Sequence, residues 1–359
     1  MSPRISRSRI SPRLFRGVAL ACVVALALII LSGAAVRLTG SGLGCPDWPS
    51  CFQHRLTATW SFHPLVEFGN RLVTIAVTVL VVVAALGSIL RKPFRSDLCW
   101  LSFGLVGGVL GQAVLGGMVV LFKLAPGLVM AHFAFSILVL ADAVVLYQRS
   151  GDERVPARPM VGRQLVGAGR LMLGLLAVVI LAGTSTTGAG PHAGNSGAKR
   201  LPIAFHSVAE LHATLAVALI GLTVGIVIAA HQAGTPAAIQ RRARVLIAVM
   251  VAQGAIGYTQ YFLRVPAGVV EVHVLGATML WIVAQHFYLG LFYRPALEPQ
   301  SPTVSSFPAE GRADDPAEGP AEGPAEGPAE GPAEGPAEGT PAGVLLAERR
   351  PRGAAAASR

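Results

Sequence analysis

Long apolar runs separated by short polar stretches dominate the chain. Most of these runs reach the about 20 residues that a helix needs to cross the hydrocarbon core of a bilayer. Within each run the apolar residues are continuous rather than alternating, which favours helices over the strands of a membrane barrel. The pattern predicts eight transmembrane helices, at about 17–36, 65–90, 98–122, 126–147, 168–188, 208–231, 245–263 and 269–293.

A second pattern is an internal repeat. Residues 111–132 align without a gap with residues 252–273, at an offset of 141, and the two copies end on His132 and His273. Four helices in each copy would give both copies the same orientation, about a pseudo-two-fold axis along the membrane normal. The predicted fold is therefore an all-α integral membrane protein, with eight transmembrane helices in two tandem pseudo-symmetric four-helix bundles.

Shorter matches extend the repeat and suggest the domain boundaries. Leu31-Ser-Gly33 is echoed by Leu181-Ala-Gly183, and Pro-Ala-Glu-Gly recurs near the carboxyl end in a tract with few apolar side chains to bury. The predicted organisation is a cytoplasmic amino-terminal segment (1–16), a first bundle (17–148), a cytoplasmic linker (149–167), a second bundle (168–293) and a disordered cytoplasmic tail (294–359).

Composition and charge agree with a membrane protein. The chain is 53% hydrophobic and 13% charged, with a net charge of +10. Its Arg and Lys residues cluster in the amino-terminal segment and in the connections after the second, fourth and sixth predicted helices. By the positive-inside rule, these connections and both termini are cytoplasmic, in a multi-pass protein of the cell membrane. The positive charge then faces anionic lipid and does not indicate nucleic-acid binding.

Two cysteines lie in the first connection on the outer, oxidising side. Cys45 and Cys51 bracket the segment Cys-Pro-Asp-Trp-Pro-Ser-Cys, and a disulfide between them is expected in that compartment. The spacing leaves open whether this bond is structural or redox-active.

Two histidines share one depth in the second bundle. His212 and His273 lie just inside the outer ends of the sixth and eighth predicted helices. Two neutral histidines that face each other from neighbouring helices are the usual axial pair of a low-spin heme in a bundle. We therefore predict a heme between them. The alternative is that each imidazole only bonds to a neighbouring helix.

The first bundle offers a different set of side chains. His132 takes the place of His273, but the counterpart of His212 is Asn70 or Gly69, and Asn70 is a poor heme ligand. One strong ligand suits a substrate better than a permanent cofactor. Glu67 precedes Asn70 on the same helical face. Its carboxyl group either acts as a proton carrier or acid/base group, or pairs with Arg71 or a loop amide.

At these positions the chain resembles the heme A synthase family, of the actinobacterial type. The resemblance covers about residues 17–293. It is carried by the motifs Arg37-Leu-Thr-Gly-Ser-Gly-Leu-Gly-Cys-Pro-Asp-Trp-Pro-Ser-Cys51, Glu67-Phe-Gly-Asn-Arg71, Ala131-His-Phe133, Thr187-Gly-Ala-Gly-Pro-His-Ala-Gly194, Glu210-Leu-His-Ala213 and Glu271-Val-His-Val-Leu-Gly276. Members of that family are eight-helix membrane enzymes that oxidise the C8 methyl group of heme O to a formyl group, giving heme A for cytochrome oxidase.

The resemblance also implies roles for single residues. The iron of a heme b would bind His212 and His273, and His132 would bind the iron of the substrate heme. Glu67 and His132 would be the catalytic residues. Asn70 and Arg71 would complete the substrate-heme pocket. The chain departs from the family at Asn70, where many members have a histidine, and at Asn195, where an acidic residue is common.

The implied partners are heme O as substrate, a heme O synthase, the assembly of cytochrome oxidase, membrane lipid and an electron donor of unknown identity. Two other functions fit parts of the pattern. A diheme electron-transfer cytochrome would use the same histidines without oxidising a substrate. A transporter would use the histidines and Glu67 as proton sites, but the lack of repeated Gly or Pro breaks within the helices argues against it.

Overall fold

A computed structural model describes residues 10–53, 55–151 and 157–293. The predicted disordered tail, 294–359, and most of the predicted amino-terminal segment lie outside the described residues. The boundaries predicted for the domains stay predictions.

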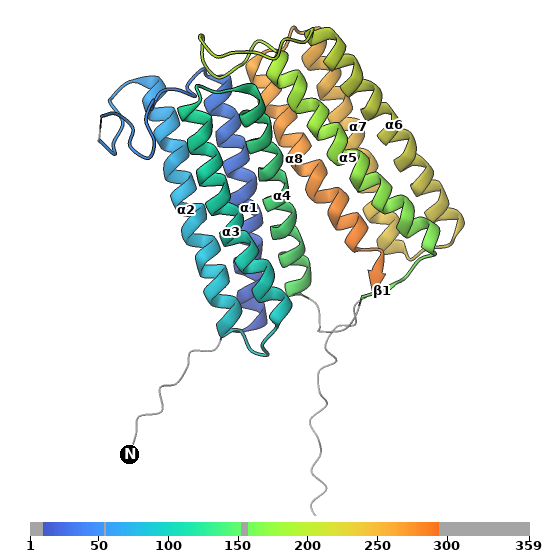
Figure 1. Ribbon diagram of the computed structural model, residues 1–359. Helices are drawn as coiled ribbons and strands as arrows, with labels where there is room; N and C mark the ends of the chain where they lie inside the picture. The colour runs from blue at the N-terminus through green and yellow to red at the C-terminus, as the bar shows by residue number, and fades with distance from the viewer. Residues whose placement is uncertain (1–9, 54, 152–156, 294–359) are drawn as a thin grey trace, which may run out of the picture. The chain divides into compact units, whose positions relative to one another are not determined.

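Eight helices fill almost all of the described chain (Figure 1). All eight are long and apolar enough to cross a membrane, which confirms the predicted all-α, multi-pass membrane fold. They are α1 (Pro12–Leu38), α2 (Phe62–Leu90), α3 (Ser96–Leu121), α4 (Pro126–Ser150), α5 (Arg163–Ala189), α6 (Phe205–Gln232), α7 (Ala237–Phe262) and α8 (Ala267–Leu289).

Several helices are longer than the apolar runs that predicted them. Helix α7 begins at Ala237 rather than near 245 and includes Arg241 and Arg242, because arginine is a favourable helix former outside the lipid as well. Helix α8 ends at Leu289, so the prediction of a helix to 293 was wrong. Phe292–Tyr293 (β2) instead pairs antiparallel with Arg158–Pro159 (β1), a two-residue ladder that no periodicity in the sequence indicates.

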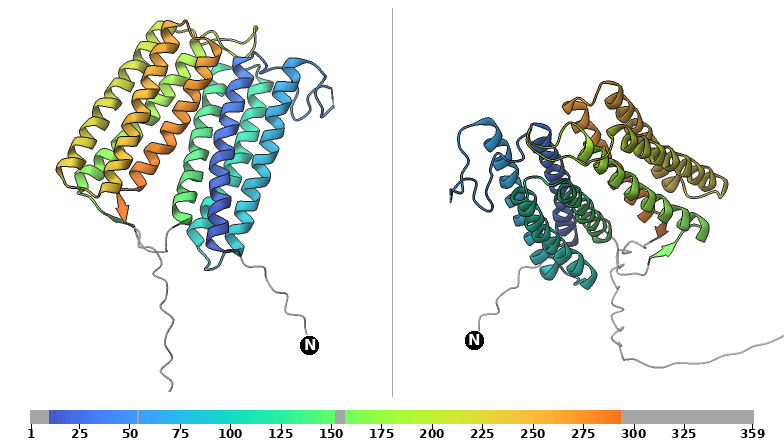
Figure 2. Two further views of the ribbon diagram at one scale, coloured as in Figure 1. Left: turned by 180° about the vertical axis from the view of Figure 1, so that it is seen from behind. Right: turned by 45° about the horizontal axis from the view of Figure 1, so that its top comes forward.

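The helices form two groups of four that contact each other along α8 and between α4 and α5. In the first group α1 packs on α2 and α4, and α3 packs between α2 and α4. The second group repeats this arrangement with α5, α6, α7 and α8. Helix α8 also contacts α1 and α4, which Figure 2 shows from behind. There the indole Nε1 of Trp281 donates to the carbonyl of Ile137 at 3.0 Å. The pseudo-two-fold axis stays a prediction.

The repeated segments 111–132 and 252–273 form the same tight turn between helices. Lys123 and Leu124, between α3 and α4, have φ of 54° and 60°, and Arg264 and Val265, between α7 and α8, have φ of 61° and 62°. Non-glycine residues rarely adopt this left-handed region, least of all a β-branched valine. The two copies therefore share an uncommon backbone conformation as well as a sequence.

Connections at one end of the helices pack on one another. We call this the loop end; it comprises the described residues of the connections, 39–53, 55–61, 122–125, 190–204 and 263–266. The amide of Gly42 donates to the carbonyl of Gly194 at 2.9 Å, and the His192 ring bonds to the carbonyl of Val265 at 2.9 Å. The loop end thus joins the two groups of helices just beyond the predicted site residues.

Candidate functional site

The two histidines of the second group face each other across a gap of suitable size for iron. His212 on α6 and His273 on α8 have ring centroids 6.3 Å apart and ring planes at 78°. A metal bound to one nitrogen of each ring lies about 2 Å from each nitrogen, which separates the two ring centres by roughly 6 Å. The measured separation therefore fits a single metal ion between the rings.

A backbone carbonyl fixes which nitrogen of His212 carries a proton. Nδ1 of His212 lies 2.9 Å from the carbonyl oxygen of Val179 on α5. Because a carbonyl oxygen only accepts, Nδ1 is the protonated nitrogen in the neutral ring, and Nε2 keeps its lone pair. Histidines that bind metals are typically held in this way. The contact to a neighbouring helix and the binding of iron are thus compatible roles.

A glutamine holds the backbone at the histidine in each copy of the repeat. The side-chain amide of Gln253 on α7 donates to the carbonyl of His273 at 2.9 Å and lies 3.1 Å from its Nδ1. In the first group, Gln112 on α3 donates to the carbonyl of His132 at 3.0 Å. Sequence reasoning aligned these glutamines but gave them no role.

Glycines leave room for the three imidazoles. A Cβ atom added at each of these glycines would come within 3.2 Å or less of the ring carbon Cε1, tighter than ordinary van der Waals contact, so a larger residue would displace the ring. The pairs are Gly116 with His132 (3.2 Å), Gly183 with His212 (3.1 Å) and Gly257 with His273 (3.1 Å).

His132 has a buried nitrogen with no hydrogen-bond partner among the described residues. That atom is Nδ1. Leaving a buried polar atom without a partner costs about 1–3 kcal/mol, and such atoms are uncommon enough to need an explanation. Among the described residues His132 therefore lacks the carbonyl partner that fixes the tautomer of His212, and its place as a candidate iron ligand rests on its match to His273 in the repeat.

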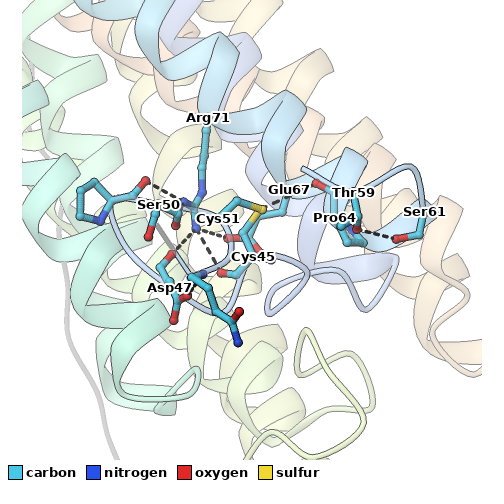
Figure 3. Close-up of a disulfide and its surroundings, with 11 residues drawn as sticks. Cys45, Asp47, Ser50, Cys51, Thr59, Ser61, Pro64, Glu67 and Arg71 are labelled. Carbon is cyan, nitrogen blue, oxygen red and sulfur yellow. Dashed lines mark hydrogen bonds and ion pairs between the residues drawn. A yellow bond between two sulfur atoms is a disulfide. The ribbon is translucent and has the colours of Figure 1, made fainter. Parts of the chain in front are cut away.

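Glu67 is buried and uses both carboxylate oxygens, as Figure 3 shows. Oε1 lies 2.7 Å from Nη2 of Arg71, one turn along α2, and Oε2 accepts from the backbone amide of Cys45 at 2.8 Å. Both of the structural partners considered from the sequence, Arg71 and a loop amide, are therefore present together.

The side chain of Arg71, on α2, lies at the centre of the loop that contains the disulfide (Figure 3). Cys45 and Cys51 are bonded and fully buried. The Arg71 guanidinium donates to four carbonyl oxygens of this loop, those of Cys45 (3.2 Å), Asp47 (3.0 Å), Pro49 (3.2 Å) and Ser50 (2.9 Å). Sequence reasoning placed Arg71 in a substrate pocket and missed this contact, because backbone acceptors leave no mark in a side-chain pattern.

These contacts generate a prediction about the disulfide. Arg71→Gln removes the charged donor from the loop. Loss of about 1.5 kcal/mol, the lower end of the range for hydrogen bonds to charged groups, raises the open population of the loop roughly tenfold. We expect dithiothreitol to reduce Cys45–Cys51 about tenfold faster, measured by timed alkylation and mass spectrometry of the peptides.

Arg55→Gln is the matched control, because Arg55 lies exposed on the same loop. It should leave the reduction rate unchanged. Equal rates for wild type and Arg71→Gln would show that Arg71 does not close the loop over the disulfide.

Comparison with known proteins places these features in a family. Residues 16–285 match the COX15-CtaA family, described as cytochrome oxidase assembly protein. Among similar proteins, the heme A synthase of Symbiobacterium thermophilum is 37% identical over 159 residues, which cover 43% of this chain and 51% of that protein. The heme A synthase of Shouchella clausii is 31% identical over 144 residues, covering 39% and 48%.

In these alignments the chain spans about half the length of the curated relatives that it matches. The family match is longer and includes Glu67, His132, His212 and His273. The chain belongs to the COX15-CtaA family of cytochrome oxidase assembly proteins.

Proposed function

We propose that this protein is a heme A synthase, which oxidises the C8 methyl group of heme O to a formyl group and so supplies heme A to cytochrome oxidase. The observation that carries the proposal is the facing pair His212 and His273, 6.3 Å apart, in a membrane protein of an oxidase-assembly family. The names of the similar proteins support the same reaction.

The second group of helices would hold a heme b. Nε2 of His212 is available for iron because Val179 takes Nδ1, and Gln253 holds the backbone of His273. When bound, the heme supplies a one-electron store, which no side chain of the chain provides. Gly183 on α5 and Gly257 on α7 leave room for the two rings, because neither residue has a Cβ atom.

The first group would bind heme O as substrate through His132. Each hydroxylation of the methyl group is a two-electron oxidation that replaces a C–H bond by C–OH, and its co-reactants come from outside the chain, either water with an electron acceptor or dioxygen with an electron donor. The geminal diol formed by the second hydroxylation loses water to leave the formyl group. The described side chains contribute binding and orientation to this reaction. Gln112 and Gly116 hold the His132 ring and its backbone in place.

Glu67 would position neighbouring residues and would not itself contact the reacting atoms. Its carboxylate ties α2, which carries Asn70, to the disulfide loop through the amide of Cys45 and to Arg71. Since a buried carboxylate with both partners is costly to replace, we propose that turnover depends on Glu67 as a positioning residue.

The proposed location is the cell membrane, with the loop end outside and both termini in the cytoplasm. The distribution of Arg and Lys along the chain supports this orientation. The disulfide at the loop end supports it too, because such bonds persist in oxidising compartments. Heme O synthase and the oxidase-assembly machinery are the proposed partners.

The iron ligands are tested by His212→Ala and His273→Ala. Each variant should lose the six-coordinate low-spin heme spectrum, because one axial imidazole is missing. The measurement is the reduced-minus-oxidised optical difference spectrum of the purified full chain.

His206→Ala serves as the matched control on α6, since His206 lies exposed and bonds to Tyr261 at the loop end. It should keep the spectrum. A low-spin spectrum that survives in both His212→Ala and His273→Ala would contradict the assignment.

The function itself is tested by Glu67→Gln in cells supplied with heme O. Glutamine keeps an acceptor for the Cys45 amide but removes the charge that Arg71 pairs with. We expect heme A, measured by chromatography of extracted hemes, to fall at least about tenfold, as the loss of about 1.4 kcal/mol or more implies.

Wild-type chain that carries two permanent hemes and forms no heme A from heme O would instead favour the electron-transfer cytochrome. Normal heme A from Glu67→Gln would remove the role given to Glu67.

A further inference from the structure

A backbone carbonyl at matching positions has different hydrogen-bond partners in the two groups of helices. In the second group His212 bonds directly to the carbonyl of Val179. In the first group Ser32 Oγ donates to the carbonyl of Ile29 at 3.1 Å, and Asn70 Nδ2 donates to Ser32 Oγ at 2.8 Å. Ile29 and Val179 occupy matching positions of α1 and α5, because the repeat aligns Leu31-Ser-Gly33 with Leu181-Ala-Gly183.

A second contact confirms that Asn70 stands where His212 stands. The Cβ position of Gly183 meets the His212 ring at 3.1 Å, and the Cβ position of the matching Gly33 meets Asn70 Nδ2 at 3.9 Å. Asn70, and not Gly69, is therefore the counterpart of His212 in the first group.

The two groups differ at two matching positions, whose side chains contact each other in the first group. Where the second group has His212 and Ala182, the first has Asn70 and Ser32. The serine hydroxyl bridges the carboxamide to the carbonyl that an imidazole reaches unaided. A serine at position 182 would compete with His212 for Val179, and an alanine at position 32 would leave Asn70 without its anchor.

The bridge also fixes the orientation of the carboxamide. The Ile29 carbonyl only accepts, so the Ser32 proton lies on that side, and Ser32 receives its second bond from a donor. The NH2 group of Asn70 therefore faces α1. Its oxygen, Oδ1, makes no hydrogen bond to the described residues, and it is a neutral oxygen, a far weaker ligand for heme iron than imidazole nitrogen.

We propose that Asn70 and Ser32 form a binding site for a small exogenous ligand, of the size of water, dioxygen or carbon monoxide, on the open face of the heme held by His132. This inference rests on the proposed function, which puts a heme in the first group. Of the two positions that the repeat matches to His273 and His212, only the first is a histidine, His132, and the anchored carboxamide of Asn70 stands at the second. Such an open position would let a small oxidant reach the iron of a bound heme O, which a permanent electron store does not require.

The test uses carbon monoxide as the probe, on the dithionite-reduced full chain produced with a supply of heme O. An iron with two protein imidazoles has no free position for carbon monoxide, and an iron with one has. We expect the wild type to bind carbon monoxide at one of its two hemes, in a spectral titration against total heme.

Two reciprocal double substitutions make the test specific. Ser32→Ala with Asn70→His copies the second group into the first, and it should abolish carbon monoxide binding and add a second low-spin heme. Ala182→Ser with His212→Asn copies the first group into the second, and both hemes should then bind carbon monoxide. Ser32→Ala alone should keep one carbon monoxide per two hemes but weaken its binding, because Asn70 then lacks its anchor.

Wild type with two hemes and no carbon monoxide binding would overturn this inference and leave the proposed function standing. Unchanged binding in Ser32→Ala with Asn70→His, at full heme content, would overturn it as well. A chain without any heme would overturn both the inference and the proposed function.

Discussion

The bond from His212 Nδ1 to the carbonyl of Val179 is the contact on which the rest of the site depends. A histidine within a membrane is costly unless its polar atoms are satisfied. This carbonyl satisfies one nitrogen, and the remaining lone pair, on Nε2, is then the only acceptor that the neutral ring has left. With His273 facing it at 6.3 Å, the pair has the spacing that one bound metal ion requires.

Polar contacts also satisfy the buried charges at the loop end. Four carbonyl oxygens of the disulfide loop converge on Arg71, and Glu67 balances the guanidinium while it takes the Cys45 amide. This short loop is thereby tied to α2 by charge-assisted bonds, which are stronger than neutral ones. These contacts connect the candidate site residues of α2 to the disulfide loop.

Most of the fold could be predicted from the sequence, because a bilayer leaves the backbone little choice but long helices. The ungapped repeat also pointed to His132 and His273, and its Gln112, Gln253, Gly116 and Gly257 carried a signal that sequence reasoning did not use. The Ser32 bridge and the carbonyl contacts of Arg71 were out of reach, since they depend on which faces of α1 and α2 meet. The β1–β2 pair had no periodic signal at all.

The two groups of helices thus differ at matching positions: one has two imidazoles, and the other has one imidazole and an anchored amide. The most direct test of the central claim is the low-temperature electron paramagnetic resonance spectrum of the oxidised full chain. Because the planes of His212 and His273 are at 78°, we predict a strongly anisotropic low-spin ferric signal, as nearly crossed imidazole planes produce. A spectrum with high-spin heme alone, or with no ferric heme, would contradict the account.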